Sequence, residues 1–96
     1  MARLNFEVSI PVAFLREGKY YIAYSPVLDL STSAKSYEEV RDRFSEIVQI
    51  FFEELLEKGT LEEVLSELGW RKVRKQWFPP VLVGQETESF RVPLSN

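Results

Sequence analysis

Residues 20–40 read YYIAYSPVLDLSTSAKSYEEV, and this stretch decides the fold. Over 19–25, Tyr20, Ile22 and Tyr24 alternate with Tyr21 and Ala23 up to Ser25-Pro26, which predicts a strand that ends at the proline. A second alternation over 28–34 predicts a shorter strand. Ser36 then precedes Glu39 by three positions, the spacing of a capping box, so a helix is expected to begin there. The stretch therefore predicts two strands that lead directly into a helix.

The residues before this stretch predict one more strand and a turn. From Leu4 to Phe14 every second residue is apolar, which predicts a strand over 4–14 with one buried face. Pro11 has no backbone N–H, so it should lie where the partner strand has already ended. Residues 16–19 predict a hairpin turn, in which Gly18 supplies a positive φ.

The residues after this stretch predict two helices. Apolar side chains recur at helical spacing up to Leu56, and Gly59 is a typical helix stop, so the first helix should span 37–58. Thr60 and Glu63 repeat the capping box, which predicts a second helix over 61–68.

Beyond Trp70 the sequence pattern predicts a single further strand. Phe90, Val92 and Leu94 alternate with polar residues and predict a strand near 88–94. Pro93 restricts this strand to a sheet edge or to exchange with another chain.

Together these elements predict an α+β fold in the order β-β-β-α-α-β. An antiparallel three-strand meander and the C-terminal strand would form one sheet, in the order 3-2-1-4, with both helices on one face. We expect a single domain over 1–96 with its core in 4–70, an extension over 71–96 and no separate DNA-binding domain.

Composition excludes several classes of function. The chain has 96 residues, a net charge of −3, and neither Cys nor His, so thiolate and imidazole chemistry are absent. The carboxylates of Asp29, Glu38, Glu39 and Asp42 lie close in sequence, as two-metal nuclease chemistry would need. A structural role explains three of them better, because Glu39 caps the helix, Glu38 suits the helix dipole and Asp42 faces solvent, which leaves only Asp29 free. We expect no enzyme activity, cofactor, metal or membrane segment, and a cytoplasmic protein.

Three blocks of sequence carry a family resemblance. They are Tyr21-Ile22-Ala23-Tyr24-Ser25-Pro26 with Leu28-Asp29-Leu30, the helix start Ser36 to Val40, and the segment Gly59 to Trp70. In this order the blocks resemble the HicB antitoxin family over roughly residues 4–70. The resemblance implies a degenerate, partial ribonuclease H-like fold. It also implies a partner, a small basic mRNA-cleaving toxin of the HicA type, which the domain would neutralise by occluding its active or RNA-binding surface.

The candidate site residues follow from this reading. Tyr21, Pro26 and Asp29 are the expected partner contacts, with Tyr21 on the opposite strand face from Tyr20 and Tyr24 and that face open to a partner. The wide apolar stripe of the first helix, with Phe51, Phe52, Leu55 and Leu56, favours a homodimer or a higher oligomer.

Two alternative functions stay open. The first is an orphan, homo-oligomeric HicB-like regulatory domain without a toxin. The second is a nucleic-acid-binding module that uses the basic segment 71–75, with Arg71, Lys72, Arg74 and Lys75, between two tryptophans.

Overall fold

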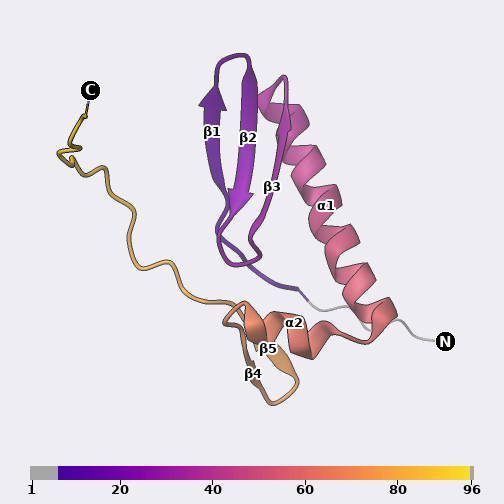
Figure 1. Ribbon diagram of the computed structural model, residues 1–96. Helices are drawn as coiled ribbons and strands as arrows, with labels where there is room; N and C mark the ends of the chain where they lie inside the picture. The colour runs from indigo at the N-terminus through magenta and orange to yellow at the C-terminus, as the bar shows by residue number, and fades with distance from the viewer. Residues whose placement is uncertain (1–6, 96) are drawn as a thin grey trace.

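The computed structural model describes residues 7–95 and has an α+β fold (Figure 1). Three antiparallel strands form one sheet in the order β1-β2-β3, with bounds Ala13–Glu17, Tyr20–Ser25 and Leu30–Ala34. Two helices follow, α1 over Tyr37–Lys58 and α2 over Leu61–Glu67. A separate hairpin of β4 (Arg71–Val73) and β5 (Gln76–Phe78) comes next.

The turn at Gly18 sets the register of the sheet. Gly18 has a φ of 59°, and the two-residue turn places Glu17 opposite Tyr20 and Ala13 opposite Tyr24. The predicted first strand over 4–14 is therefore wrong in its bounds, because β2 ends at Ser25 and offers no partner to residues 7–12. Residues 4–6 of that prediction lie outside the described residues. The expectation that Pro11 precedes the paired region is confirmed.

Local capping fixes the ends of α1 at the predicted bounds, 37–58. The Glu39 N–H donates to the Ser36 Oγ at 3.1 Å, which satisfies an amide that has no partner inside the helix. Gly59 closes the helix with a φ of 70°, and its N–H is directed at the carbonyls of the last turn. Thr60 precedes α2 without a side-chain capping bond, so the predicted second capping box is wrong, although the helix forms.

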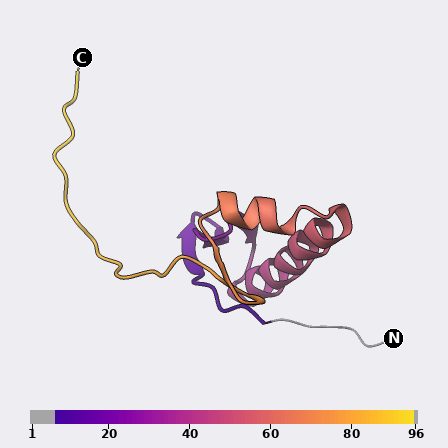
Figure 2. The ribbon, with the colours of Figure 1, turned by 90° about the horizontal axis from the view of Figure 1, so that it is seen from below.

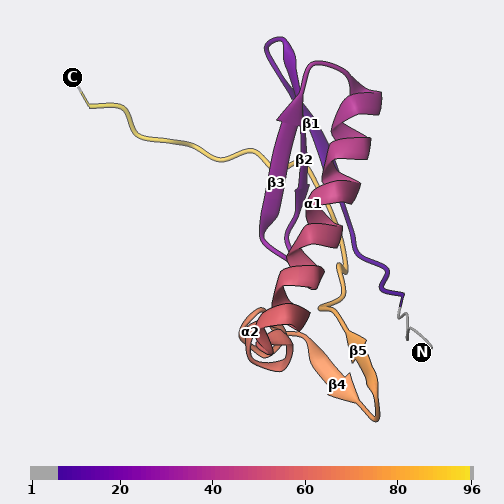
Figure 3. The ribbon, with the colours of Figure 1, turned by 90° about the vertical axis from the view of Figure 1, so that its right-hand side faces the viewer.

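Helix α1 packs across one face of β2 and β3, and β1 is the edge strand farther from the helix (Figures 2 and 3). Small side chains line the contact: Ala23 and Ala34 are buried against Val40 and Phe44. A larger cluster joins α1, α2 and the β2–β3 turn, and its buried members are Val27, Leu28, Phe52, Leu55, Leu65 and Trp70. The fold is thus a single helical layer on one face of a three-stranded sheet.

One polar group is buried without a partner. The Ser25 side chain is completely inaccessible, and its Oγ has no hydrogen-bond partner in the described part of the chain. A buried hydroxyl in this state costs about 1–3 kcal/mol of folding free energy.

The C-terminal segment departs most from the prediction. Residues 79–95 have no regular structure, so the expected strand over 88–94 and its place in a 3-2-1-4 sheet are not found in the isolated chain. The β4–β5 hairpin was not predicted, because its two strands have three residues each, too few to show an alternating pattern. The extended tail raises the radius of gyration to 16.8 Å. A compact domain of this length would have about 12–13 Å.

Candidate protein-interaction surfaces

The β2–β3 turn is anchored to the hydrophobic core. Val27 and Leu28 are buried, and the Trp70 Nε1–H donates to the Val27 carbonyl oxygen at 2.8 Å. These anchors leave Pro26 and Asp29 exposed on the outside of the turn. Two of the three predicted partner contacts therefore lie together on a turn that is fixed to the core.

Asp29 has an unusual backbone conformation for a residue with a side chain. Its φ is 53°, in the left-handed region that Asp tolerates better than most residues. The Tyr24 hydroxyl approaches its Oδ1 at 3.5 Å, at the long limit of a hydrogen bond. The carboxylate thus projects from a constrained position beside an aromatic ring.

Tyr21 lies on a different surface from these two residues. It shares its strand face with Ala23 and Ser25, which are fully buried under α1, and it is itself half-buried. The Arg16 guanidinium lies over its ring at 5.9 Å from the centroid. The expectation that the Tyr21 face is open is wrong, because α1 packs on the side of the small residues.

The open face of the sheet carries Tyr20, Ile22 and Tyr24, which the sequence pattern assigned to the core. Leu15, Tyr20, Ile22 and Tyr24 share this face by strand register. Leu15 and Tyr20 are about half exposed, at 53% and 49%. The alternation that groups them was visible in the sequence, but nothing in it showed which face the helix would cover.

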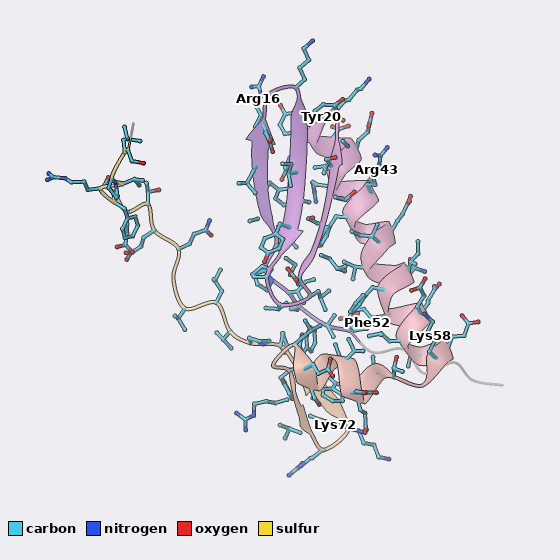
Figure 4. All side chains as sticks on the ribbon, in the orientation of Figure 1. Arg16, Tyr20, Arg43, Phe52, Lys58 and Lys72 are labelled. Carbon is cyan, nitrogen blue, oxygen red and sulfur yellow. The ribbon has the colours of Figure 1, made fainter. Side chains whose placement is uncertain are left out.

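Many glutamates lie on the C-terminal half of α1 and on α2, at the end of the molecule where Figure 4 labels Phe52, Lys58 and Lys72. Between 53 and 67 there are six glutamates and a single lysine, Lys58, which gives a net charge of −5 over this segment. All six glutamates are exposed on the C-terminal half of α1 and on α2, and we call them the acidic surface: Glu53, Glu54, Glu57, Glu62, Glu63 and Glu67. A concentration of this kind attracts a basic partner.

The predicted basic segment forms the β4–β5 hairpin. Lys72 makes an ion pair with Glu62 and lies 5.8 Å from the centroid of the Trp77 ring. Trp70 is buried, so its ring offers no stacking face for bases, whereas Trp77 is half-buried and packs against the core. Arg71, Arg74 and Lys75 are exposed, and Arg74 takes a φ of 61° at the turn.

The carboxylates considered for metal chemistry do not come together. Asp29 lies in the β2–β3 turn, whereas Glu38, Glu39 and Asp42 lie near the start of α1. Within residues 7–95 there is no group of three acidic, His or Cys side chains that could hold a metal ion. No helix in the same range is both long and apolar enough to cross a membrane.

Comparisons with known proteins return no match. No protein-family model matches the chain, and neither does any curated protein or any solved structure. The resemblance of residues 4–70 to the HicB family therefore rests on the sequence motifs alone.

Proposed function

We propose that this chain is a HicB-like antitoxin domain of the cytoplasm. It binds a small, basic, mRNA-cleaving protein of the HicA type and neutralises it by covering its active or RNA-binding surface. In this proposal the sheet and α1 are a partial ribonuclease H-like fold that serves as a binding scaffold without catalysis.

The observation that carries the proposal is the acidic surface. A ribonuclease that grips RNA must present cations to phosphates, and the same cations are attracted to a dense group of carboxylates. Six exposed glutamates lie over 53–67 with one lysine, and Lys72 of the hairpin pairs with Glu62, which leaves five glutamates outside this ion pair in a chain whose total charge is only −3. The acidic surface of this chain would contact the cations of the toxin at the site where the toxin otherwise binds RNA.

The β2–β3 turn supplies the second part of the contact. Pro26 and Asp29 are exposed, and the core holds their backbone through Val27, Leu28 and the Trp70 hydrogen bond. A contact that is already ordered loses little conformational entropy on binding. We propose that this turn fixes orientation while the acidic surface attracts the partner. Tyr21 acts in this proposal indirectly, as a support for the sheet under α1.

The test uses the product of a short basic reading frame adjacent to this gene. We expect the purified chain to bind it at low salt, to suppress its cleavage of RNA at equimolar amounts, and to lose affinity steeply as salt rises. A triple variant, Glu53→Gln, Glu57→Gln and Glu63→Gln, should weaken binding by roughly tenfold or more at low salt.

A matched control removes equal charge from the N-terminal half of α1, away from the acidic surface. Glu38→Gln, Asp42→Asn and Glu46→Gln also neutralise three exposed carboxylates, but near the start of α1. We expect the control to change affinity by less than about threefold. Equal losses from the two triple variants would rule out a localised acidic contact, and absence of binding to the basic product would remove the antitoxin proposal.

A second candidate, the orphan homo-oligomeric domain, is favoured by a different observation. The tail over 79–95 exposes several large apolar side chains, including Val83 at 96% and Leu94 at 93%. Self-association, without any toxin, would bury these apolar side chains. A tight homo-oligomer together with a gene that has no basic neighbour would support this candidate over the first.

A further inference from the structure

Strand β1 is the least covered element of the sheet. Phe14 and Leu15 are adjacent, so they point to opposite faces, and both are exposed, at 40% and 53%. The strand is also at the sheet edge, and within residues 7–95 no strand pairs with its outer side. Helix α1 packs mainly on β2 and β3 and reaches β1 where the Tyr37 ring meets Phe14 edge to face, with ring centroids 5.1 Å apart. A strand with a free edge and one open face is a site where another strand can pair.

The tail carries a strand pattern without a sheet. Phe90, Val92 and Leu94 alternate with polar residues and are exposed at 80%, 72% and 93%. In a strand these three side chains would share one face. The tail leaves the β5 end of the molecule and passes on the β1 side, away from α1 (Figures 1 and 2).

We propose that residues 88–94 of one copy of this chain add to the free edge of β1 in a second copy, antiparallel, with Val92 opposite Phe14. The exchange is reciprocal, so each copy donates one tail and receives one. The product is a closed two-fold dimer.

The hydrogen-bonding directions of both segments support this register. In a hairpin with a two-residue turn the flanking residues pair with each other, here Glu17 with Tyr20. Alternate residues then direct their N–H and C=O groups the other way, so Phe14 and Arg16 offer theirs to the free edge. With Val92 opposite Phe14, Pro93 falls on the outer side of the added strand, where its missing N–H is harmless.

Side-chain chemistry selects the antiparallel direction. With Val92 opposite Phe14, Phe90 lies opposite Arg16 on the α1 side of the sheet, where the β1 side chains at its outer edge remain exposed. The acidic start of the segment, Glu86 and Glu88, then reaches the hairpin end of β1, where the cations of Arg16 and Lys19 lie. A parallel arrangement would place these carboxylates at the Pro11 end, which carries no cation between 8 and 13.

The direction of the tail assigns the strand to a second copy. In Figure 1 the tail rises along the same direction as β1, so a chain's own tail would meet its own β1 in parallel. A two-fold axis perpendicular to the strands reverses this direction and gives the antiparallel pairing. Leu82 and Gln85 lie beside Pro11, Val12 and Ala13 of the same chain, so the connecting residues already bring the donated strand to the β1 side of the molecule.

The experiment measures mass and backbone protection on the full chain. Sedimentation velocity should show a dimer of twice the 11.2 kDa chain mass, and hydrogen exchange should show protected amides at Phe14 and Arg16. Val92→Pro removes an N–H that faces β1 in both exchanged strands, and should weaken the dimer by about a hundredfold and expose those two amides. Arg91→Pro places the same residue where the N–H faces outward, and should change the dimer constant by less than about threefold.

Each other outcome overturns the proposal. A monomer with protected Phe14 and Arg16 means that the tail pairs within its own chain, and a monomer without protection means that it does not pair. A dimer without this protection uses another interface. Equal effects of Val92→Pro and Arg91→Pro would contradict the register. The tail lies outside the buried core, so far-ultraviolet circular dichroism should show that both variants remain folded.

Discussion

Trp70→Phe tests whether the core truly holds the exposed β2–β3 turn. Trp70 is 4% exposed, its Nε1–H donates to the Val27 carbonyl at 2.8 Å, and its ring meets Phe52 edge to face at 6.2 Å. Phenylalanine keeps most of the apolar ring but removes the donor. The substitution therefore separates the hydrogen bond to the turn from the aromatic packing.

The expected loss follows from burial. A buried carbonyl left without a donor costs about 1–3 kcal/mol. The smaller ring leaves unfilled space in the core, which adds roughly 1 kcal/mol. The sum of about 2–4 kcal/mol is large against the 5–15 kcal/mol that stabilises a typical domain, and corresponds to a fall in Tm on the order of 10–20 °C.

Urea unfolding followed by circular dichroism at the helix band measures this loss without relying on tryptophan fluorescence. The midpoint should fall while the m-value stays constant. Trp77→Phe is the control, because that ring is only half-buried, and it should cost roughly 1 kcal/mol. If Trp70→Phe costs no more than Trp77→Phe, the hydrogen bond does not anchor the turn, and the argument for a pre-ordered Pro26 and Asp29 fails.

Three further predictions concern local energetics and are measured in the same unfolding assay. Ser36→Ala removes the oxygen that accepts from the Glu39 N–H and should cost about 1 kcal/mol, whereas Ser36→Asp should keep the cap; equal losses would contradict this role. Ser25→Ala removes a buried hydroxyl without a partner and should leave stability unchanged or raise it by about 1 kcal/mol; a large loss would mean that the hydroxyl is satisfied. Arg74→Gly relieves a φ of 61° at the β4–β5 turn and should stabilise the chain by about 0.5–1 kcal/mol, and a loss would count against strain at this turn.

The elements with local signals were predictable from the sequence. The bounds of α1 depend on Ser36 and Gly59, which act on backbone groups within one turn of themselves, so the predicted range is confirmed. The start of β1 was not predictable in this way. Alternation before Phe14 shows a strand-like pattern, but pairing is set by the turn at Gly18 and by the end of β2 at Ser25.

The candidate site was predictable only in part. Pro26 and Asp29 lie exposed in the connection where the sequence placed them. The prediction that Tyr21 lies on an open face is wrong. It followed from the rule that the largest side chains of a strand face the core, which assigned the opposite face to the core. In this sheet the large Phe44 side chain of α1 packs against the small side chains of Ala23 and Ala34 on the strands. Which face a helix covers depends on such tertiary fits, which strand periodicity alone does not contain.

The segregation of charge along the chain has a consequence for how a partner arrives. The six glutamates of 53–67 are followed after Gly69 and Trp70 by the four cations of 71–75, so opposite charges occupy neighbouring regions of the surface. The molecule is therefore an electric dipole whose moment is hidden by a net charge of −3. A cationic body diffusing toward it experiences a torque as well as an attraction. It is turned toward α2 and away from the hairpin before the first side chains touch.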